Sequence, residues 1–381
     1  MSERRKNIVI VCHYYVPHMG GIEIVVKNQA EQLAARGHNV TVITSRIGAR
    51  AFRQRINNVT VLRLPALNIL EKRGVPFPFF EPFSLLWTLI FTLRKADAVH
   101  IHDAVYMPCV VAAMVASLWR KPLFVTQHVD LVQHPSLFVM LVQKVLHALA
   151  GQLVYRTSSV VFTLNDRVAQ HVVEHGAASH KLKNVVNGVD TSLFHPATSG
   201  EKQAVRQTFN LSATKPVVLF VGRFVPKKGF DKVLAAHSSS YQLVFAGGDA
   251  RKSNDPNIIF LGKLPQSQLA NLYRAADVFV LPSIGEGFPL SVQEAMATGL
   301  PIILADDKGY ARYKLDRDLV CALPEATDQN VRMAIAELTA NAGRRHRMGA
   351  YSRSYADQHF SWERITTQLE TQYDSLPGGR S

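Results

Sequence analysis

The stretch DVFVLPSIGEGFPLSVQEAMATGLPIILAD, residues 277–306, decides how this chain is expected to fold. It contains two short apolar runs, DVFVLPS and LPIILAD, which are predicted to be buried strands. Residues 283–287 are predicted to form a turn, followed by a helix that begins near Pro289 and ends at Gly299. Strands joined by a helix run parallel, so the stretch is expected to be one βαβ unit of a parallel sheet.

The same alternation of short apolar runs with helix-length segments extends along the chain of 381 residues. It includes the runs NIVIVCHYY, HNVTVIT, AVHIHD, PLFVTQH, SSVVFTL, KPVVLFVG and YQLVFAGG. Residues 187–203 carry turn residues and little periodicity, which is typical of a linker. The sequence therefore predicts an α/β protein with two Rossmann-like, doubly wound parallel sheets, at residues 1–190 and 200–360. Such sheets bind ligands beyond the carboxyl ends of their strands, so the domains are expected to face each other across a cleft.

Composition narrows the class of partner. The net charge of +14 favours an anionic partner, but the basic residues are scattered and no nucleic-acid motif occurs. An anionic substrate and an acidic membrane surface both remain open. The three cysteines are far apart without metal spacing, which fits a reducing compartment, and the first residues show no signal-peptide pattern. We therefore expect a cytoplasmic protein.

Two carboxylates flank the turn in the opening stretch. Glu286 lies in the glycine turn and Glu294 lies one turn inside a nearly uncharged helix. Side chains tilt towards the start of a helix, so Glu294 is expected to lean back towards Glu286 and the free backbone N–H groups of Gly287 and Phe288. A ligand with both phosphates and hydroxyls would satisfy all of these groups, as a nucleotide sugar does. The alternative is a salt-bridged core glutamate beside an unrelated loop glutamate.

Two glycine-containing turns follow strands elsewhere. In VGRFVPKKGFD, Arg223 and Lys228 lie between a strand and a helix start, a place that suits phosphate. In PHMGGIE, Gly20 and Gly21 would let the backbone approach a ligand closely. Neither matches a Walker A loop or a dinucleotide fingerprint. Taken alone, the first is explained equally well as a solvated basic turn, and the second is better explained as a plain turn.

His128 follows the strand PLFVTQ, at the end of a parallel strand where sites collect. It could donate a hydrogen bond to a substrate, or be a partnered structural histidine. His100 and His102 alternate along a strand and are expected to point the same way. No third ligand is evident, so no metal site is predicted.

Together these motifs resemble the family 4 glycosyltransferases, which have the GT-B fold, and the resemblance covers nearly the whole chain. The specific signal is the E-x7-E element formed by Glu286 and Glu294. Further matches, in the family's order, are PHMGGIE, NGVD with Phe194 and Pro196 after it, GRFVPKKG and FSWE. The resemblance implies a retaining transfer of a sugar from a nucleoside diphosphate donor, UDP- or GDP-linked, to a glycan, glycolipid or lipid-linked acceptor. It implies no obligatory metal and no other cofactor.

The resemblance also implies roles. Glu294 would hold the ribose, Glu286 the donor sugar, and Arg223 with Lys228 would neutralise the leaving diphosphate. His128 would contact the donor sugar near the reacting carbon. The remaining donor contacts are expected at Gly20, Gly21, Lys263, Gly287, Phe288, Pro289 and Leu290. Residues 361–381 are expected to form a helix that crosses back onto the first domain.

One loop departs from the family's pattern. After the helix and its following strand, the family has a glycine pair and then a glutamate, whereas residues 305–318 here are ADDKGYARYKLDRD. This difference leaves the donor's identity, and the activity itself, open. Within the loop, residues 316–318 spell the DxD motif of other glycosyltransferases, for which chance is the better explanation.

Three further alternatives stay open. Residues 76–95 and 135–149 are apolar and rich in phenylalanine and leucine, so they are either buried helices or contacts with an anionic membrane, at the inner face of the plasma membrane. Another GT-B enzyme, such as a sugar-nucleotide epimerase or a phosphorylase, is the second alternative. A non-catalytic nucleotide-sugar binder is the third.

Overall fold

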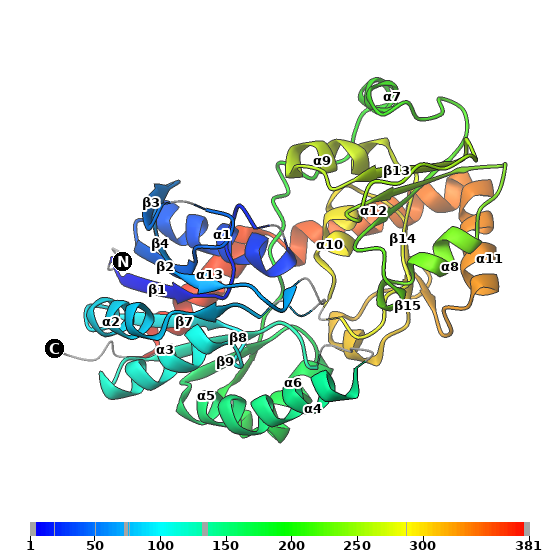
Figure 1. Cartoon of the computed structure of the whole chain (residues 1–381). Helices are drawn as coiled ribbons and strands as arrows, with labels where there is room; N and C mark the ends of the chain where they lie inside the picture. The colour runs from blue at the N-terminus through cyan, green and yellow to red at the C-terminus, as the bar shows by residue number, and fades with distance from the viewer. Residues whose placement is uncertain are drawn as a thin grey trace. The chain divides into compact units, whose positions relative to one another are not determined.

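The computed structural model describes residues 5–18, 20–49, 51–71, 75, 77–131, 136–286 and 288–376. The chain divides into two compact units. Unit 1 comprises residues 1–188 together with 362–381, and unit 2 comprises residues 189–361 (Figure 1). The last segment of the chain therefore belongs to the same unit as its beginning.

Unit 1 is built on an eight-stranded sheet with the strand order β10-β9-β8-β7-β1-β2-β4-β3. Its strands are β1 (Asn7–Val11), β2 (Asn39–Ser45), β3 (Arg53–Ile56), β4 (Val59–Leu64), β7 (Ala98–His102), β8 (Leu123–Gln127), β9 (Val160–Thr163) and β10 (Leu182–Asn184). All pairs are parallel except β3 with β4 at the edge. The strand order reverses between β1 and β7. A separate two-stranded ribbon joins β5 (Ala66–Leu67) to β6 (Phe79–Phe80).

Helices cover both faces of this sheet, as buried parallel strands require. One face carries α2 (Pro82–Leu93), α3 (Met107–Leu118), α5 (Gln152–Thr157) and α6 (Asp166–Glu174). The other face carries α1 (Gly21–Ala35) and the terminal helix α13 (Trp362–Asp374), which pack against each other (Figure 1). The side chains of α13 that enter this core are Trp362, Ile365, Leu369 and Tyr373.

One helix of unit 1 differs from the others because it is hardly buried. Helix α4 (Leu137–Leu146) has no buried residue, and it continues through a π-helical turn, His147–Gly151, into α5. Residues 137–157 together form one helix that is long and apolar enough to cross a membrane, by length and composition only. Of the two alternatives left open for residues 135–149, a buried helix does not describe residues 137–146, whereas α3 does bury one face.

Unit 2 repeats the architecture with six parallel strands in the order β13-β12-β11-β14-β15-β16. They are β11 (Val217–Val221), β12 (Gln242–Ala246), β13 (Ile258–Gly262), β14 (Val278–Leu281), β15 (Ile302–Ala305) and β16 (Cys321–Leu323). Its helices are α7 (Ser199–Thr208), α8 (Phe230–Ala235), α9 (Gln266–Ala275), α10 (Leu290–Ala297), α11 (Asp328–Ala340) and α12 (Ala342–His359), with 3-10 turns at Pro226–Lys228 and Lys308–Tyr313. Its strand order reverses between β11 and β14. Both sheets are thus doubly wound, as the sequence predicts.

Candidate active site

The predicted donor residues of unit 2 collect at its topological switch point. Arg223 follows the end of β11, and Glu286 follows the end of β14, its neighbour in the sheet. At a switch point the connections leave the sheet in opposite directions and open a crevice for a ligand. The two loops are joined directly, because the Ile284 backbone N–H donates to the Lys227 carbonyl oxygen at 3.1 Å.

Lys228 and Glu286 form an ion pair between these two loops. The Nζ–Oε2 distance is 3.0 Å, and each side chain is 17 % exposed. Gly229 allows this close approach, because its φ of +71° lies in the left-handed region. A Cβ atom there would also lie 2.6 Å from the Pro282 side chain and 2.9 Å from its carbonyl oxygen. The sequence predicted both charged residues as site residues but not that they contact each other.

Glu294 lies beneath the turn, on α10, and is 4 % exposed. Its Oε2 accepts a hydrogen bond from the Tyr273 hydroxyl at 3.0 Å. Burial raises the pKa of Glu294 to about 8, and the hydrogen bond from Tyr273 offsets only part of that rise. At neutral pH this carboxyl is therefore largely protonated, and it can both donate and accept hydrogen bonds towards a hydroxylated ligand.

The loop that departs from the family's pattern is fastened to this turn. The Asp307 carboxylate accepts hydrogen bonds from the backbone N–H groups of Gly285, at 3.2 Å, and Gly309, at 2.8 Å. Phe288 is buried and stacks on Tyr313 with ring centroids 4.2 Å apart. Aspartate and tyrosine side chains thus hold residues 305–318 against the E-x7-E turn.

The other predicted donor residues have different environments. The side chains of Arg223 and Lys263 are exposed, Lys263 directly after β13. Pro289 is the N-cap residue of α10 rather than a first-turn residue, and Leu290 begins that helix. Gly287 lies outside the described residues.

The predicted residues of unit 1 also lie at carboxyl ends of neighbouring strands. His128 follows β8, and its Nε2 lies 2.9 Å from Nδ1 of His102, the last residue of β7. The His128 backbone N–H donates to Asp103 Oδ1 at 2.8 Å. His128 is 4 % exposed, and burial lowers its pKa to about 4, so the ring is neutral at pH 7. As expected, His100 and His102 share a face, with their rings stacked 4.9 Å apart.

The predicted glycine pair lies at the start of α1. Gly20 is the N-cap in an extended conformation, and a Cβ atom there would meet the Glu23 carboxylate. Glu23 is buried and pairs with His18, whose other ring nitrogen contacts Glu71; both distances are 2.8 Å. The hydrogen bond to Glu23 raises the pKa of His18 above its ordinary value; burial opposes this rise, and the hydrogen bond to Glu71 adds to it. At Gly21 an added Cβ atom would meet no other atom within 4 Å.

Sequence reasoning missed several of these groups. Tyr273, Asp307 and Asp103 each hold a predicted site element, but each comes from a different segment of the chain. Only the position of Asp103, directly after an apolar strand, offers a sequence signal. Tyr273 and Asp307 have none, because their role depends on which elements pack together.

Within the described residues, no group of three or more His, Cys, Asp or Glu side chains could hold a metal ion. The DxD sequence at residues 316–318 serves the loop itself. Asp316 accepts the Asp318 backbone N–H, and Arg317 pairs with Asp306.

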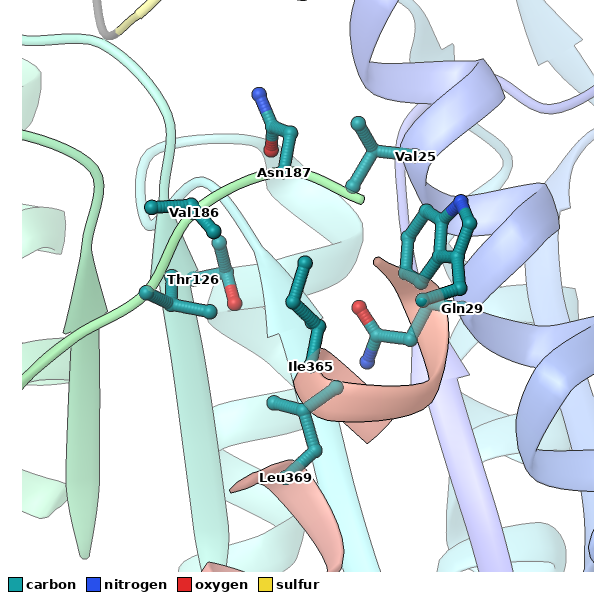
Figure 2. A pocket seen from close by; sticks show the side chains of 9 residues that line it. Val25, Gln29, Thr126, Val186, Asn187, Ile365 and Leu369 are labelled. Atoms are coloured by element: carbon teal, nitrogen blue, oxygen red, sulfur yellow. The ribbon is translucent and has the colours of Figure 1, made fainter. Parts of the chain in front are cut away.

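A small pocket in unit 1 lies apart from the predicted residues (Figure 2). Its walls come from α1, the end of β8, the segment after β10 and α13. Most of the lining is apolar, with Gln29, Thr126 and Asn187 as polar members. Since no predicted site residue lines it, we assign it no part in the chemistry.

Two family models match the chain. The model described as Glycosyltransferase Family 4 matches residues 19–193, and that described as Glycosyl transferases group 1 matches residues 201–355. The chain is 26 % identical to a D-inositol 3-phosphate glycosyltransferase of Corynebacterium aurimucosum, over 93 % of this chain and 90 % of that protein. It is 27 % identical to a GDP-mannose-dependent alpha-mannosyltransferase of Corynebacterium glutamicum, over 79 % of this chain and 72 % of that protein.

Among solved structures, the chain is similar to Anabaena HepE in complex with UDP and glucose. The TM-score is 0.79 at 18 % identity, over 98 % of this chain and all of that one. At this identity the likeness concerns the fold, and it extends over both units.

Proposed function

Because the chain belongs to the family 4, group 1 glycosyltransferases and has their GT-B fold, we propose that it transfers a sugar, with retention of anomeric configuration, from a nucleoside diphosphate sugar to a glycan or lipid-linked acceptor. The observation that carries the proposal is the switch point of unit 2. There a buried carboxyl, Glu294, lies beneath a turn in which Glu286 and Lys228 form an ion pair. Hydroxyls and phosphates are the ligand groups that such a set recognises.

In this proposal the donor lies along the switch point of unit 2. The ribose hydroxyls bind Glu294. The diphosphate lies against Arg223, Lys228 and the residues at the start of α10, from Phe288 to Leu290. Glu286 exchanges its bond with Lys228 for hydroxyls of the donor sugar. The base lies near Lys263, after β13. Arg223 is exposed and therefore accessible to a ligand.

The bond that breaks joins the anomeric carbon to the diphosphate oxygen, and negative charge grows on that oxygen. Fixed cations aimed at a developing charge are commonly the largest contribution to catalysis. Without a ligand Lys228 pairs with Glu286, and the exchange of Glu286 to the donor sugar leaves the Lys228 ammonium to pair with the diphosphate. The leaving phosphate accepts the proton of the acceptor hydroxyl on the same face of the sugar, so no protein nucleophile is required.

Unit 1 would supply the acceptor side. His128 is neutral and fixed by His102 and Asp103, so it can direct a hydrogen bond to the donor sugar without adding charge. Gly20 and Gly21 would let the start of α1 approach the diphosphate. We further propose that the protein works in the cytoplasm, peripherally on the inner face of the plasma membrane, in keeping with its net charge of +14.

A thermal-shift screen with UDP-, GDP- and ADP-sugars tests the proposal. We expect a UDP- or GDP-sugar to raise the melting temperature. The similar structure of HepE was solved with UDP and glucose, and the similar mannosyltransferase is named for GDP-mannose. Glu294→Ala and Arg223→Ala should lose most of this shift while remaining folded. If no nucleotide sugar stabilises the protein, the proposal fails.

Turnover of the stabilising donor then separates the alternatives. Release of nucleoside diphosphate that depends on an acceptor, with the anomeric configuration retained by NMR, supports transfer. Interconversion of sugar nucleotides without acceptor would indicate an epimerase. Binding without turnover over a range of acceptors would indicate a non-catalytic binder.

A further inference from the structure

The outer surface of one helical layer of unit 1 is unusually apolar. Helices α2 and α3 turn leucine and alanine side chains inwards to the core, yet their outer sides also carry large apolar residues. Helix α4 adds more, and it continues into α5, which packs beside α3. We call this surface the apolar face; its most exposed members are Phe83, Trp87, Leu118, Leu137, Phe138 and Leu149.

Helix α4 is the extreme case. Leu137 is 85 % exposed, and none of the helix's ten residues is buried. An apolar helix with no buried side gains nothing from packing, and most helical stability in proteins comes from packing. Exposed apolar patches beyond a few hundred Å² mark contacts with proteins or membranes. Something outside the described residues must therefore cover this face.

The charges around the apolar face indicate that the partner surface in contact with it is anionic. Helices α2, α3, α4 and α5 and the π-helical turn contain no aspartate or glutamate, and the acidic residues next to them are Glu81, the N-cap of α2, and Asp97. More cations lie within or directly after these helices: Arg94, Lys95, Arg120, Lys121, Lys144 and Arg156. An apolar surface in which basic residues outnumber acidic ones is the pattern of protein segments that lie in a membrane interface.

We propose that the apolar face docks unit 1 flat on an anionic lipid bilayer, with α4 lying in the boundary between headgroups and acyl chains. The helix does not span the bilayer, because its second half is fixed in the fold: Val154 and Tyr155 of α5 are buried in the core of unit 1. A second copy of the chain is a poorer cover. A two-fold interface places the same patch on both subunits and would bring these cations together with fewer acidic partners than cations.

This docking surface deepens the proposed function, and for its consequence it rests on that function. The chain runs from β8, whose end bears His128, to α4. The apolar face that docks on the bilayer and the proposed acceptor side therefore belong to the same unit. An acceptor held in the bilayer by a lipid would reach the site without leaving the membrane, so we infer a lipid-linked acceptor rather than a soluble glycan.

Vesicle co-sedimentation of the full chain tests the docking. We expect binding to vesicles of 70 % phosphatidylcholine and 30 % phosphatidylglycerol, and much weaker binding to phosphatidylcholine alone or at 1 M salt. A triple variant, Leu137→Ser, Phe138→Ser and Leu141→Ser, changes only exposed side chains and should fold normally. Each inserted apolar side chain contributes about tenfold or more, so binding should fall by well over 100-fold.

Matched controls distinguish vesicle binding by this face from nonspecific binding by other exposed apolar or basic residues. Phe52→Ser and Met333→Ser remove exposed apolar side chains outside the face and should bind vesicles as the unaltered chain does. Arg94→Gln, Lys95→Gln and Lys144→Gln together should weaken binding by about 100-fold, at about fivefold per cation near an anionic surface. As a control, replacing three exposed cations of unit 2 by glutamine, Lys252, Lys314 and Arg347, should leave vesicle binding unchanged.

Tryptophan fluorescence gives a second, direct measurement. Trp87 is 68 % exposed on α2, whereas Trp362 is buried. Trp119 is partly exposed at the end of α3, so two tryptophans belong to the face. Brominated lipids should quench the protein's fluorescence, and Trp87→Phe together with Trp119→Phe should abolish most of the quenching while keeping the surface apolar. The proposal would be overturned if the variants of the apolar face co-sedimented with vesicles as strongly as the unaltered chain does. It would also be overturned if analytical ultracentrifugation showed a dimer that the same substitutions dissociate.

The two proposals can fail separately. Variants of the apolar face should keep the thermal shift by a nucleotide sugar, because they leave unit 2 unchanged. A nucleotide-sugar shift without vesicle binding would overturn the docking surface alone. Vesicle binding without any nucleotide-sugar shift would overturn the proposed function and, with it, the inference of a lipid-linked acceptor.

Discussion

Glu294 illustrates how much the environment of one residue decides. A glutamate in a small apolar helix could pair with a cation and stay ionised, but this one meets the hydroxyl of Tyr273 instead. A hydroxyl cannot offset the cost of burying a charge, so the carboxyl keeps its proton to a pH of about 8. That makes it a hydrogen-bonding group that can adapt to hydroxyls, and also a pH-dependent element of stability.

The first prediction concerns that pH dependence. Between pH 4.5 and 8 the folded carboxyl holds a proton that the unfolded chain has released, so the contribution of Glu294 to the free energy of unfolding falls as pH rises. Glu294→Gln cannot ionise, so its free energy of unfolding does not fall in this way. We expect the free energy of unfolding of the variant, relative to that of the unaltered chain, to increase between pH 5 and 8 by on the order of a few kcal/mol and to stay constant above pH 8.

Urea unfolding of both proteins at several pH values, monitored in parallel, measures this difference. Thr339→Ala, on the surface of α11 away from the site, serves as a control that should show a constant offset. A constant difference for Glu294→Gln would mean that Glu294 is ionised throughout.

The second prediction concerns the Lys228–Glu286 ion pair. Lys228→Met removes a cation from the proposed path of the leaving diphosphate, and the rate of transfer should fall by about 10²–10³. The double variant Lys228→Met, Glu286→Gln removes both charges of the ion pair, and it should recover part of the stability that Lys228→Met loses without restoring the rate. Lys252→Met, which removes an exposed cation elsewhere on unit 2, is the control. An unchanged kcat would remove Lys228 from the catalytic set.

At the scale of elements, the site depends on how two loops leave a parallel sheet. Residues after β11 and β14 meet because these strands are neighbours, although about fifty residues of chain separate their loops. The Asp307 loop after β15 closes the arrangement from the other side. These contacts let charged and polar side chains stand at fixed positions over a buried core.

The third prediction tests the tightest point of this arrangement. Gly229→Ala places a Cβ in the left-handed region and against the backbone of Pro282. We expect it to lower the free energy of unfolding by about 1–3 kcal/mol. Thermal or urea unfolding measures the change. Gly200→Ala, at the start of α7 with open space around it, should be neutral or slightly stabilising, and similar effects of the two substitutions would argue against strain at Gly229.

At the scale of the whole molecule, the C-terminal helix makes the first unit discontinuous in sequence. Helix α13 packs on α1 and fills the core on one face of the sheet of unit 1. Its Glu370 also binds Arg36 and His38, which lie at the end of α1 and just before β2. The fold of unit 1 is therefore incomplete until residues 362–374 have been synthesised.

The fourth prediction follows from this packing. Truncation after Ser361 removes the four buried hydrophobic side chains of α13, each of which contributes about 2–5 kcal/mol when truncated in a core. We expect unit 1 to melt well below its normal temperature, or not to fold, while unit 2 keeps its own transition. Differential scanning calorimetry measures both transitions. Truncation after Leu376 keeps the four side chains and should behave as the full chain; unchanged melting after the shorter truncation would contradict the role of α13.

The sequence by itself predicted the fold class and most candidate site residues. Periodic apolar runs identify buried parallel strands, and the E-x7-E spacing places Glu286 and Glu294 around one helix start, because both signals are local. The sequence left open whether residues 135–149 are buried. It could not tell because a helix that is apolar on all sides looks the same in a core and at a surface.

Only the tertiary structure decided the partners. That Glu294 meets Tyr273, that Lys228 meets Glu286, and that His128 meets His102 are consequences of which strands are neighbours. The exposure of α4 was decided in the same way, because the described residues leave none of its side chains buried. Periodicity records what a segment can bury, whereas charge states and surfaces depend on what the rest of the chain brings to it.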